Sequence, residues 1–104
     1  MRTSMAVVLA SALLAFALAL PASAQESSVG GRLAVRWCMA CHIVDASQTK
    51  ATDNAPSFRD IAARPATTAE SLDRYLSTGH TLMPDFSLDK QERSALVAYI
   101  LSLR

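Results

Sequence analysis

The residues best suited to chemistry lie together in one short stretch, Cys38-Met39-Ala40-Cys41-His42. The spacing C-x-x-C-H is typical of covalent haem attachment, in which two thiols add to the porphyrin vinyl groups and the adjacent imidazole binds the iron. Two thiols about one helical turn apart can reach vinyl groups on one edge of a flat ring. The stretch therefore predicts one haem c, attached through Cys38 and Cys41, with His42 as the proximal iron ligand.

Two other kinds of site use a C-x-x-C pair, and both need residues that this chain lacks. A thioredoxin-like dithiol requires a βαβ pattern around the motif, and a structural zinc site requires two further Cys or His ligands at short spacing. The chain has two cysteines and two histidines, and the second histidine, His80, is remote. Haem attachment would consume both sulfurs as thioethers, so we expect no disulfide even in an oxidising compartment.

Further positions are candidates for completing the site. Met83 precedes Pro84, and an extended residue before proline can direct its thioether at a metal from the side opposite His42. Methionine is nevertheless more often a core residue than a ligand. The Pro56 carbonyl could accept the Nδ1 hydrogen of His42, or Pro56 could simply begin a turn. His80 could compete with Met83 for the iron, or it could be a surface group.

Residues 1–24 have the features of a cleaved secretory signal peptide. A basic residue precedes the apolar run Met5–Leu20, and Ala22-Ser23-Ala24 forms an A-x-A cleavage site. The run ends at a proline and is short for a bilayer span, which needs ~20 apolar residues. We therefore expect export to the periplasm of a bacterium, one domain over residues 25–104, and no stable membrane insertion after cleavage.

Charge and size limit the possible partners. The sequence has 10 Lys and Arg against 9 Asp and Glu, with no block of like charge, so we expect no nucleic-acid partner and little long-range steering. A domain as short as residues 25–104 buries a marginal share of its surface and usually needs a further source of stability, such as a metal, disulfides or a cofactor. A covalently held haem would supply that stability.

Helical signals recur along the chain, and no segment shows convincing strand alternation. The sequence predicts three main helices and a short one, with a long loop between Ile43 and Ala66. The expected spans are Ser27 or Ser28 into the haem motif, Phe58 to about Ala63, Thr68 to Gly79, and Leu88 to Leu103.

The expected helix caps follow from local patterns. Ser57 with Asp60 predicts the start of the short helix, and Thr67-Thr68-Ala69-Glu70 predicts a capping box for the next one. Ser87 or Asp89 is expected to cap the last helix. Paired glycines, Gly30-Gly31, indicate either a late start of the first helix or a close approach by another backbone or ring.

Taken together, these features resemble the small class I c-type cytochromes, the monohaem cytochrome c family, from about Gly30 to the end of the chain. The resemblance implies an all-α cytochrome c fold, with the helices wrapped around one covalent haem. It also implies His42 and Met83 as axial ligands, with Pro56 as the carbonyl partner of His42.

The resemblance extends to helix packing, with one departure. In the family a glycine of the first helix packs against an aromatic residue of the last, and Gly30 and Tyr99 match these roles. The aromatic residue usual four positions before the first cysteine is Ala34 here. We expect Leu33 or Trp37, which share a helix face, to make the core contacts instead.

What the resemblance implies for function is a soluble periplasmic electron-transfer protein, cycling Fe(III)/Fe(II) and not an enzyme. Two protein ligands leave no open coordination position for a substrate. Its partners would be redox proteins such as an oxidase, reductase or dehydrogenase, and it would be a monomer or a subunit of a redox complex. Two alternatives stay open: a haem-based sensor or small-ligand binder with a labile distal ligand, and a dedicated electron-transfer subunit of one periplasmic oxidoreductase.

Overall fold

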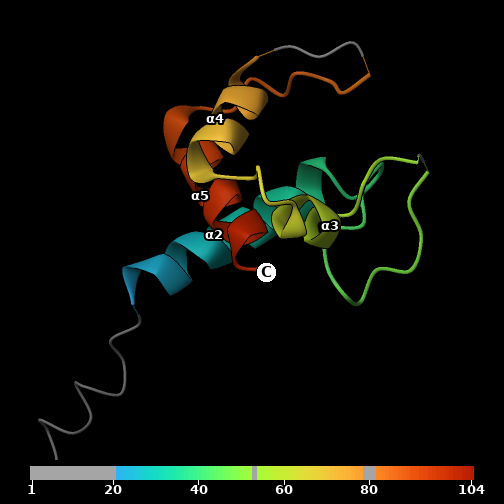
Figure 1. Ribbon diagram of the computed structural model, residues 1–104, viewed down its shortest axis with the longest axis horizontal. Helices are drawn as coiled ribbons and strands as arrows, with labels where there is room; N and C mark the ends of the chain where they lie inside the picture. Colours follow the sequence, from blue (N-terminus) through green and yellow to red (C-terminus); the bar gives the residue numbers. More distant parts are fainter. Residues whose placement is uncertain (1–20, 53, 79–81) are drawn as a thin grey trace, which may run out of the picture.

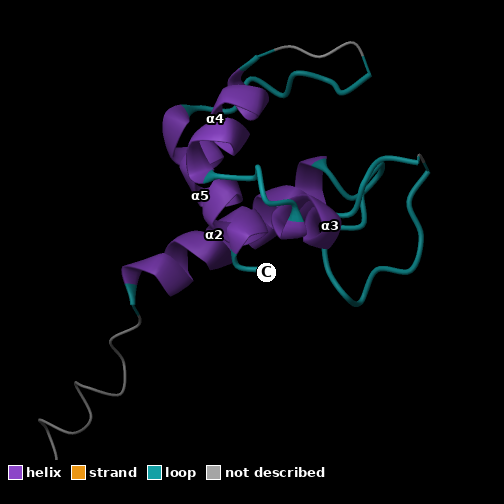
Figure 2. Ribbon diagram, in the orientation of Figure 1, coloured by secondary structure: helices purple, strands orange, loops and turns teal. Residues whose placement is uncertain are grey.

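The computed structural model of the 104-residue chain describes residues 21–52, 54–78 and 82–104 (Figure 1). Within these ranges the only regular elements are helices, which loops and turns connect (Figure 2), as the sequence predicts. Most of the predicted signal peptide, as well as Gly79 and His80, lies outside the described residues. The helices are α2 (Ala22–Trp37), α3 (Phe58–Ala63), α4 (Ala69–Ser77) and α5 (Lys90–Leu101). None of the described helices is both long and apolar enough to cross a membrane.

Helices α2 and α5 cross in direct backbone contact. Gly30 is buried at the crossing, and a Cβ atom added there would lie 1.9 Å from the Ala95 carbonyl oxygen and 2.7 Å from Tyr99 Cβ. At Gly31 an added Cβ would instead meet the Tyr99 ring at 3.3 Å. The predicted packing of Gly30 against Tyr99 is confirmed, and the glycine pair marks a close approach rather than a late helix start.

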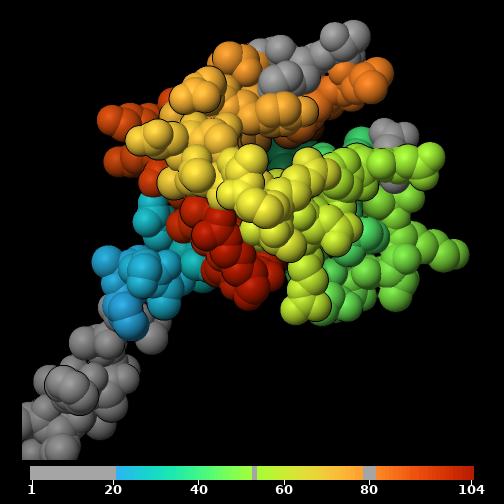
Figure 3. Space-filling view, in the orientation of Figure 1, coloured from blue at the N-terminus to red at the C-terminus, as the bar shows by residue number. Residues whose placement is uncertain are grey.

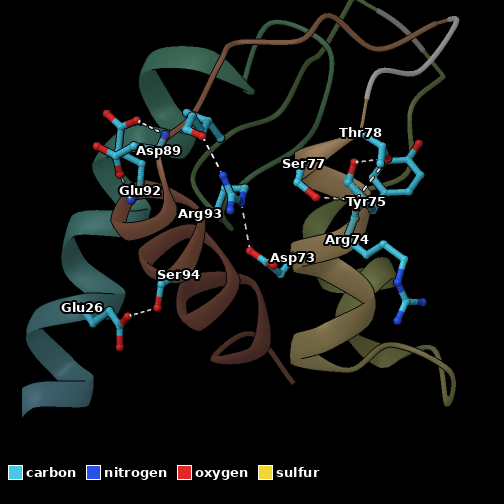
Figure 4. A network of polar contacts seen from close by, with 11 residues as sticks. Glu26, Asp73, Arg74, Tyr75, Ser77, Thr78, Asp89, Glu92, Arg93 and Ser94 are labelled. Carbon is cyan, nitrogen blue, oxygen red and sulfur yellow. Dashed lines mark hydrogen bonds and ion pairs between the residues drawn. The ribbon is translucent and has the colours of Figure 1, made fainter.

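The start of α2 differs from the prediction. The helix begins at Ala22, ahead of both expected serine caps, and its N-cap position, Pro21, offers no side-chain hydrogen bond. Ser28 lies inside the helix and donates to the Gln25 carbonyl at 3.0 Å. The additional first turns of α2 also contact α5. There Glu26 accepts a hydrogen bond from Ser94 at 2.5 Å (Figure 4).

The short helix α3 begins where the sequence predicts. The Ser57 hydroxyl accepts a hydrogen bond from the backbone N–H of Asp60 at 3.0 Å, which satisfies one of the N–H groups left unpaired at a helix start. Phe58 at the first helical position is buried, whereas Ile61 is half-buried against the core. The Ser57 cap therefore starts the helix so that its first residue, Phe58, is buried in the core.

The capping box of α4 is shifted by one residue from the prediction. Thr68, not Thr67, is the N-cap, and it exchanges hydrogen bonds with Ser71 rather than pairing with Glu70. Thr67 is buried, and its hydroxyl donates to the Ile61 carbonyl at 2.6 Å. Because that contact occupies the Thr67 side chain, the next threonine takes the cap.

The last helix starts at a complete capping box. Asp89 accepts from the backbone N–H of Glu92 at 2.8 Å, and Glu92 accepts from the Asp89 N–H at 2.9 Å. Ser87 has φ 54°, so it belongs to the preceding turn and is not the cap. On the next turn Arg93 forms an ion pair with Asp73 of α4 at 3.0 Å (Figure 4), which joins the last two helices.

The core is small and built mainly from aliphatic residues. Ala34, at the position where the family usually has an aromatic residue, is fully buried. Leu33 is half-buried, but Trp37 departs from the expected core role: it is 38% exposed and packs against Phe86. The buried cluster consists of Ala34, Cys38, Val44, Phe58, Ala62, Leu72, Leu96, Val97 and Ile100.

The close helix crossing predicts that Gly30→Ala destabilises the protein by about 1–3 kcal/mol, the usual cost of overpacking. The added methyl group meets backbone atoms that cannot rotate away. Gly31→Ala is the matched control, because a ring can shift and alanine gains up to ~1 kcal/mol of helix propensity over glycine. Denaturant unfolding of both holoproteins measures the difference. Equal stability of the two variants would contradict the prediction.

Candidate haem site

The C-x-x-C-H stretch continues the last turn of α2. The Cys38 N–H donates to the Ala34 carbonyl at 2.8 Å, so the first cysteine still follows the helix. The carbonyl of Cys38 then accepts from the N–H of Cys41 at 3.2 Å and of His42 at 2.9 Å. These bonds fold the motif into a compact turn, which places both cysteines and the histidine on one short, hydrogen-bonded segment.

The two cysteines differ in burial. Cys38 is 6% exposed, whereas Cys41 is half-buried, and both are free thiols. Burial raises the pKa of the Cys38 thiol to about 11, and the neighbouring Cys41 adds to the shift. Before haem is attached, the Cys38 sulfur is therefore a protonated thiol at neutral pH.

His42 is oriented by the loop that follows it. The Nδ1 atom lies 2.6 Å from the Pro56 carbonyl oxygen, and the ring stands 5.4 Å from the Phe58 ring, centroid to centroid. A carbonyl only accepts, so Nδ1 carries the proton in this contact. In the neutral tautomer that this contact favours, the other ring nitrogen, Nε2, has a free lone pair that can bind a metal.

Two loop residues that sequence analysis did not single out hold the motif backbone. The Gln48 side-chain amide donates to the carbonyls of Met39 at 2.8 Å and His42 at 2.7 Å. Thr52 donates to the Ala40 carbonyl from both its N–H, at 2.8 Å, and its hydroxyl, at 2.7 Å. A single glutamine and threonine in a polar loop give no local signal, because their partners are defined only when the loop folds back.

The loop containing Gln48 begins with an Asx turn. One carboxylate oxygen of Asp45 accepts from the Ser47 N–H at 2.8 Å, the Ser47 hydroxyl at 2.5 Å and the Gln48 N–H at 3.1 Å. These donors, the Ser47 hydroxyl first, lower the pKa of Asp45. The Tyr99 hydroxyl donates to the adjacent Val44 carbonyl at 2.6 Å, so α5 holds the start of this loop.

Met83 lies on the segment between α4 and α5, and its side chain is half-buried. Phe86 on the same segment packs on Trp37, the last residue of α2, with ring centroids 5.4 Å apart. The space-filling view shows a recess between the segment that follows α4 and the loop after the haem motif (Figure 3). The aromatic pair therefore brings the expected distal segment next to the helix that carries the first cysteine.

The chemistry of this donor set fits haem c. The turn supplies two unpaired thiols and an imidazole whose Nδ1 is already hydrogen-bonded. Those are the groups needed for two thioether bonds and one nitrogen ligand to iron. Among the described residues, no group of three or more His, Cys, Asp or Glu side chains is placed to hold a metal ion directly.

Comparison with known proteins places this geometry in a family. The profile described as "Cytochrome C oxidase, cbb3-type, subunit III" matches residues 25–100. A curated relative, cytochrome c-552 of Bradyrhizobium diazoefficiens, is 41% identical over 83 residues, which is 80% of this chain and 80% of that protein. No solved structure matches significantly.

The fold and the site define the class as the small monohaem c-type cytochromes. The chain belongs to the cytochrome c family that the matching profile represents, and its cofactor is covalent haem c. It is accordingly a haem-containing electron-transfer protein. The resemblance inferred from the motif and the helices is thereby confirmed.

The Asx turn predicts a specific acid sensitivity of the holoprotein. Because the folded state lowers the pKa of Asp45, its contribution to stability is present above the pKa of the unfolded carboxyl and is lost as the pH falls through the folded one. Asp45→Asn keeps an acceptor oxygen but cannot titrate, so stability should fall less between neutral and strongly acidic pH. Asp60→Asn makes the same charge change outside this turn. Unfolding measured across the pH range checks the prediction, which fails if both variants follow the same curve.

Proposed function

We propose that this chain is an exported, periplasmic electron carrier in which Cys38 and Cys41 form the thioethers and His42 and Met83 are the axial ligands. The observation that carries the proposal is the contact of His42 Nδ1 with the Pro56 carbonyl at 2.6 Å, on a C-x-x-C-H turn. It leaves Nε2 of His42 available for the iron and restrains the plane of the ring, which supports the proposed role of His42 as a ligand.

In this proposal the residues of the chain bind and orient the haem and do not themselves react. Haem c supplies reversible one-electron exchange at its iron. Pro56 keeps a proton at His42 Nδ1, which orients the imidazole, and Met83 offers a thioether, which favours the reduced iron. If His42 and Met83 both held the iron, the haem would offer no open position to a substrate, so the proposed role is a carrier and not an enzyme.

The partner contact is proposed to lie beside the Met83 segment. Leu82 is 96% exposed and Met39 is 40% exposed, so apolar side chains are available on either side of the site. Brief redox encounters use small interfaces of less than about 1,200 Å². A second redox protein docking here would meet an apolar surface with little charge to steer it.

A second candidate is a role as the electron-transfer subunit of a larger enzyme. The matching family is described as a subunit of a cytochrome c oxidase, whereas the curated relative is named as a cytochrome alone. The two roles use the same site and differ in whether the chain leaves its partner. Co-purification of the chain from the native host distinguishes a stable complex from a free carrier.

Met83→Ala is expected to remove the weak far-red absorption band that sulfur bound to ferric haem produces. Loss of the thioether should also lower the reduction potential. His80→Ala is the matched control and should keep the band, since His80 is not the proposed ligand. The measurement is the absorption spectrum of the oxidised holoprotein. A wild-type protein without the band, or a band that survives Met83→Ala, would favour the sensor or ligand-binding alternative.

Leu82→Glu should slow oxidation of the reduced protein by membranes of its native host roughly tenfold, the size of a typical interface hot spot. The far-red band and the reaction with ascorbate should not change, because the side chain is 96% exposed. Val29→Glu introduces the same charge on α2, at a residue that is 40% exposed. Stopped-flow kinetics check the effect. Equal slowing by both variants would place the contact elsewhere.

A further inference from the structure

The carbonyl groups of the haem-binding turn need partners that the turn itself cannot supply. A helix leaves its last carbonyls without internal donors. Here Cys38 O is satisfied within the turn by the N–H groups of Cys41 and His42. The carbonyls of Met39, Ala40 and His42 lie further along the turn, and they are paired by the loop that follows.

Gln48 makes most of these contacts with one side chain. Its Nε2 lies 2.8 Å from Met39 O, 2.7 Å from His42 O and 2.9 Å from Lys50 O. Its Oε1 accepts from the Val44 N–H at 2.9 Å. An amide nitrogen has two hydrogens, so at least one hydrogen is shared between two of the three acceptors. One side chain therefore binds two carbonyls of the motif and two backbone groups of its own loop, at Val44 and Lys50.

Thr52 and Tyr99 complete the attachment. Thr52 holds Ala40 O through two donors, and Tyr99 of α5 holds Val44 O at 2.6 Å. The loop is thus anchored to the last helix at one end and to the motif at the other. Gln48, between these anchors, is half-buried, and its own N–H is held by Asp45.

His42 is consequently held at two places. Its ring is bound through Nδ1 to Pro56 O, and its backbone carbonyl is bound to the Gln48 amide. A hydrogen-bonded ring keeps its plane only if the backbone that carries it does not move. The backbone contact is therefore part of what orients the ring.

We propose that Gln48, supported by Thr52, is a positioning residue for the proximal ligand: it clamps the backbone of the haem-binding turn so that His42 keeps its bond to Pro56. The proposal rests on the proposed function, in which His42 binds the iron. Gln48 itself does not contact the iron, and it acts through the carbonyls of Met39 and His42.

Gln48→Glu is the sharpest test, because glutamate has nearly the same shape and keeps an oxygen for the Val44 N–H. It cannot donate to the carbonyls, and it places a negative oxygen against them. In the ferrous holoprotein the exchange of the His42 Nδ1 proton with deuterium, followed by NMR, should accelerate about tenfold or more, since the bond to Pro56 opens more often. The haem methyl shifts of the ferric protein, which depend on the imidazole plane, should change as well.

The controls separate the clamp from general stability and from the proposed function. Gln91→Glu makes the same substitution at an exposed position of α5 and should leave exchange and methyl shifts unchanged. Wild-type His42 ring protons must show the upfield shift of an iron-bound imidazole. If they do not, the proposed function fails, and with it the role of Gln48 in positioning an iron ligand.

The remaining outcomes decide the proposal itself. A Gln48→Glu protein that melts earlier but keeps wild-type proton exchange and methyl shifts would show a merely structural role and overturn the proposal. If that variant yields no holoprotein, Thr52→Val decides, because it removes one of the two donors to Ala40 O. Faster exchange in Thr52→Val supports the clamp, and wild-type exchange there rejects it.

Discussion

Helix α2 crosses α5 so closely that a methyl group at Gly30 would lie 1.9 Å from the Ala95 carbonyl oxygen. The haem motif is the direct continuation of α2, so this contact sets where both cysteines and His42 stand relative to the last helix. The same face of α5 carries Tyr99, whose hydroxyl holds the loop after the motif. The crossing therefore positions the motif and its supporting loop together.

The loop after the motif works by polar contacts rather than by apolar packing. Its side chains and backbone donate to carbonyls of the turn that follows α2, and Pro56 in turn accepts from the His42 ring. Among the described residues, no buried side-chain polar atom lacks a partner. In so small a domain, where apolar burial is marginal, these contacts give a long loop one defined conformation.

Local signals were reliable where the capping partners are near in sequence and have no competitor. Ser57 and Asp89 cap the helices that the sequence predicted for them. The prediction failed at the start of α2, where contacts such as Glu26 with Ser94 accompany an earlier helix start. At α4 the cap lies one residue later than predicted. Thr67 donates to the Ile61 carbonyl, and Thr68 is the N-cap instead. Trp37, which was expected in the core, is 38% exposed and packs instead against Phe86, on the segment between α4 and α5.

The sequence by itself determined the cofactor and the helical class, since thiol spacing and apolar periodicity are properties of neighbouring residues. It also indicated Pro56 as a possible partner of His42, although a simple turn was equally compatible with the sequence. Only the tertiary structure decided that contact, and only the folded loop revealed Gln48 and Thr52 as partners of the motif. The physical reason is that a hydrogen bond between distant residues depends on how the loop closes, and loop closure leaves no periodic trace in the sequence.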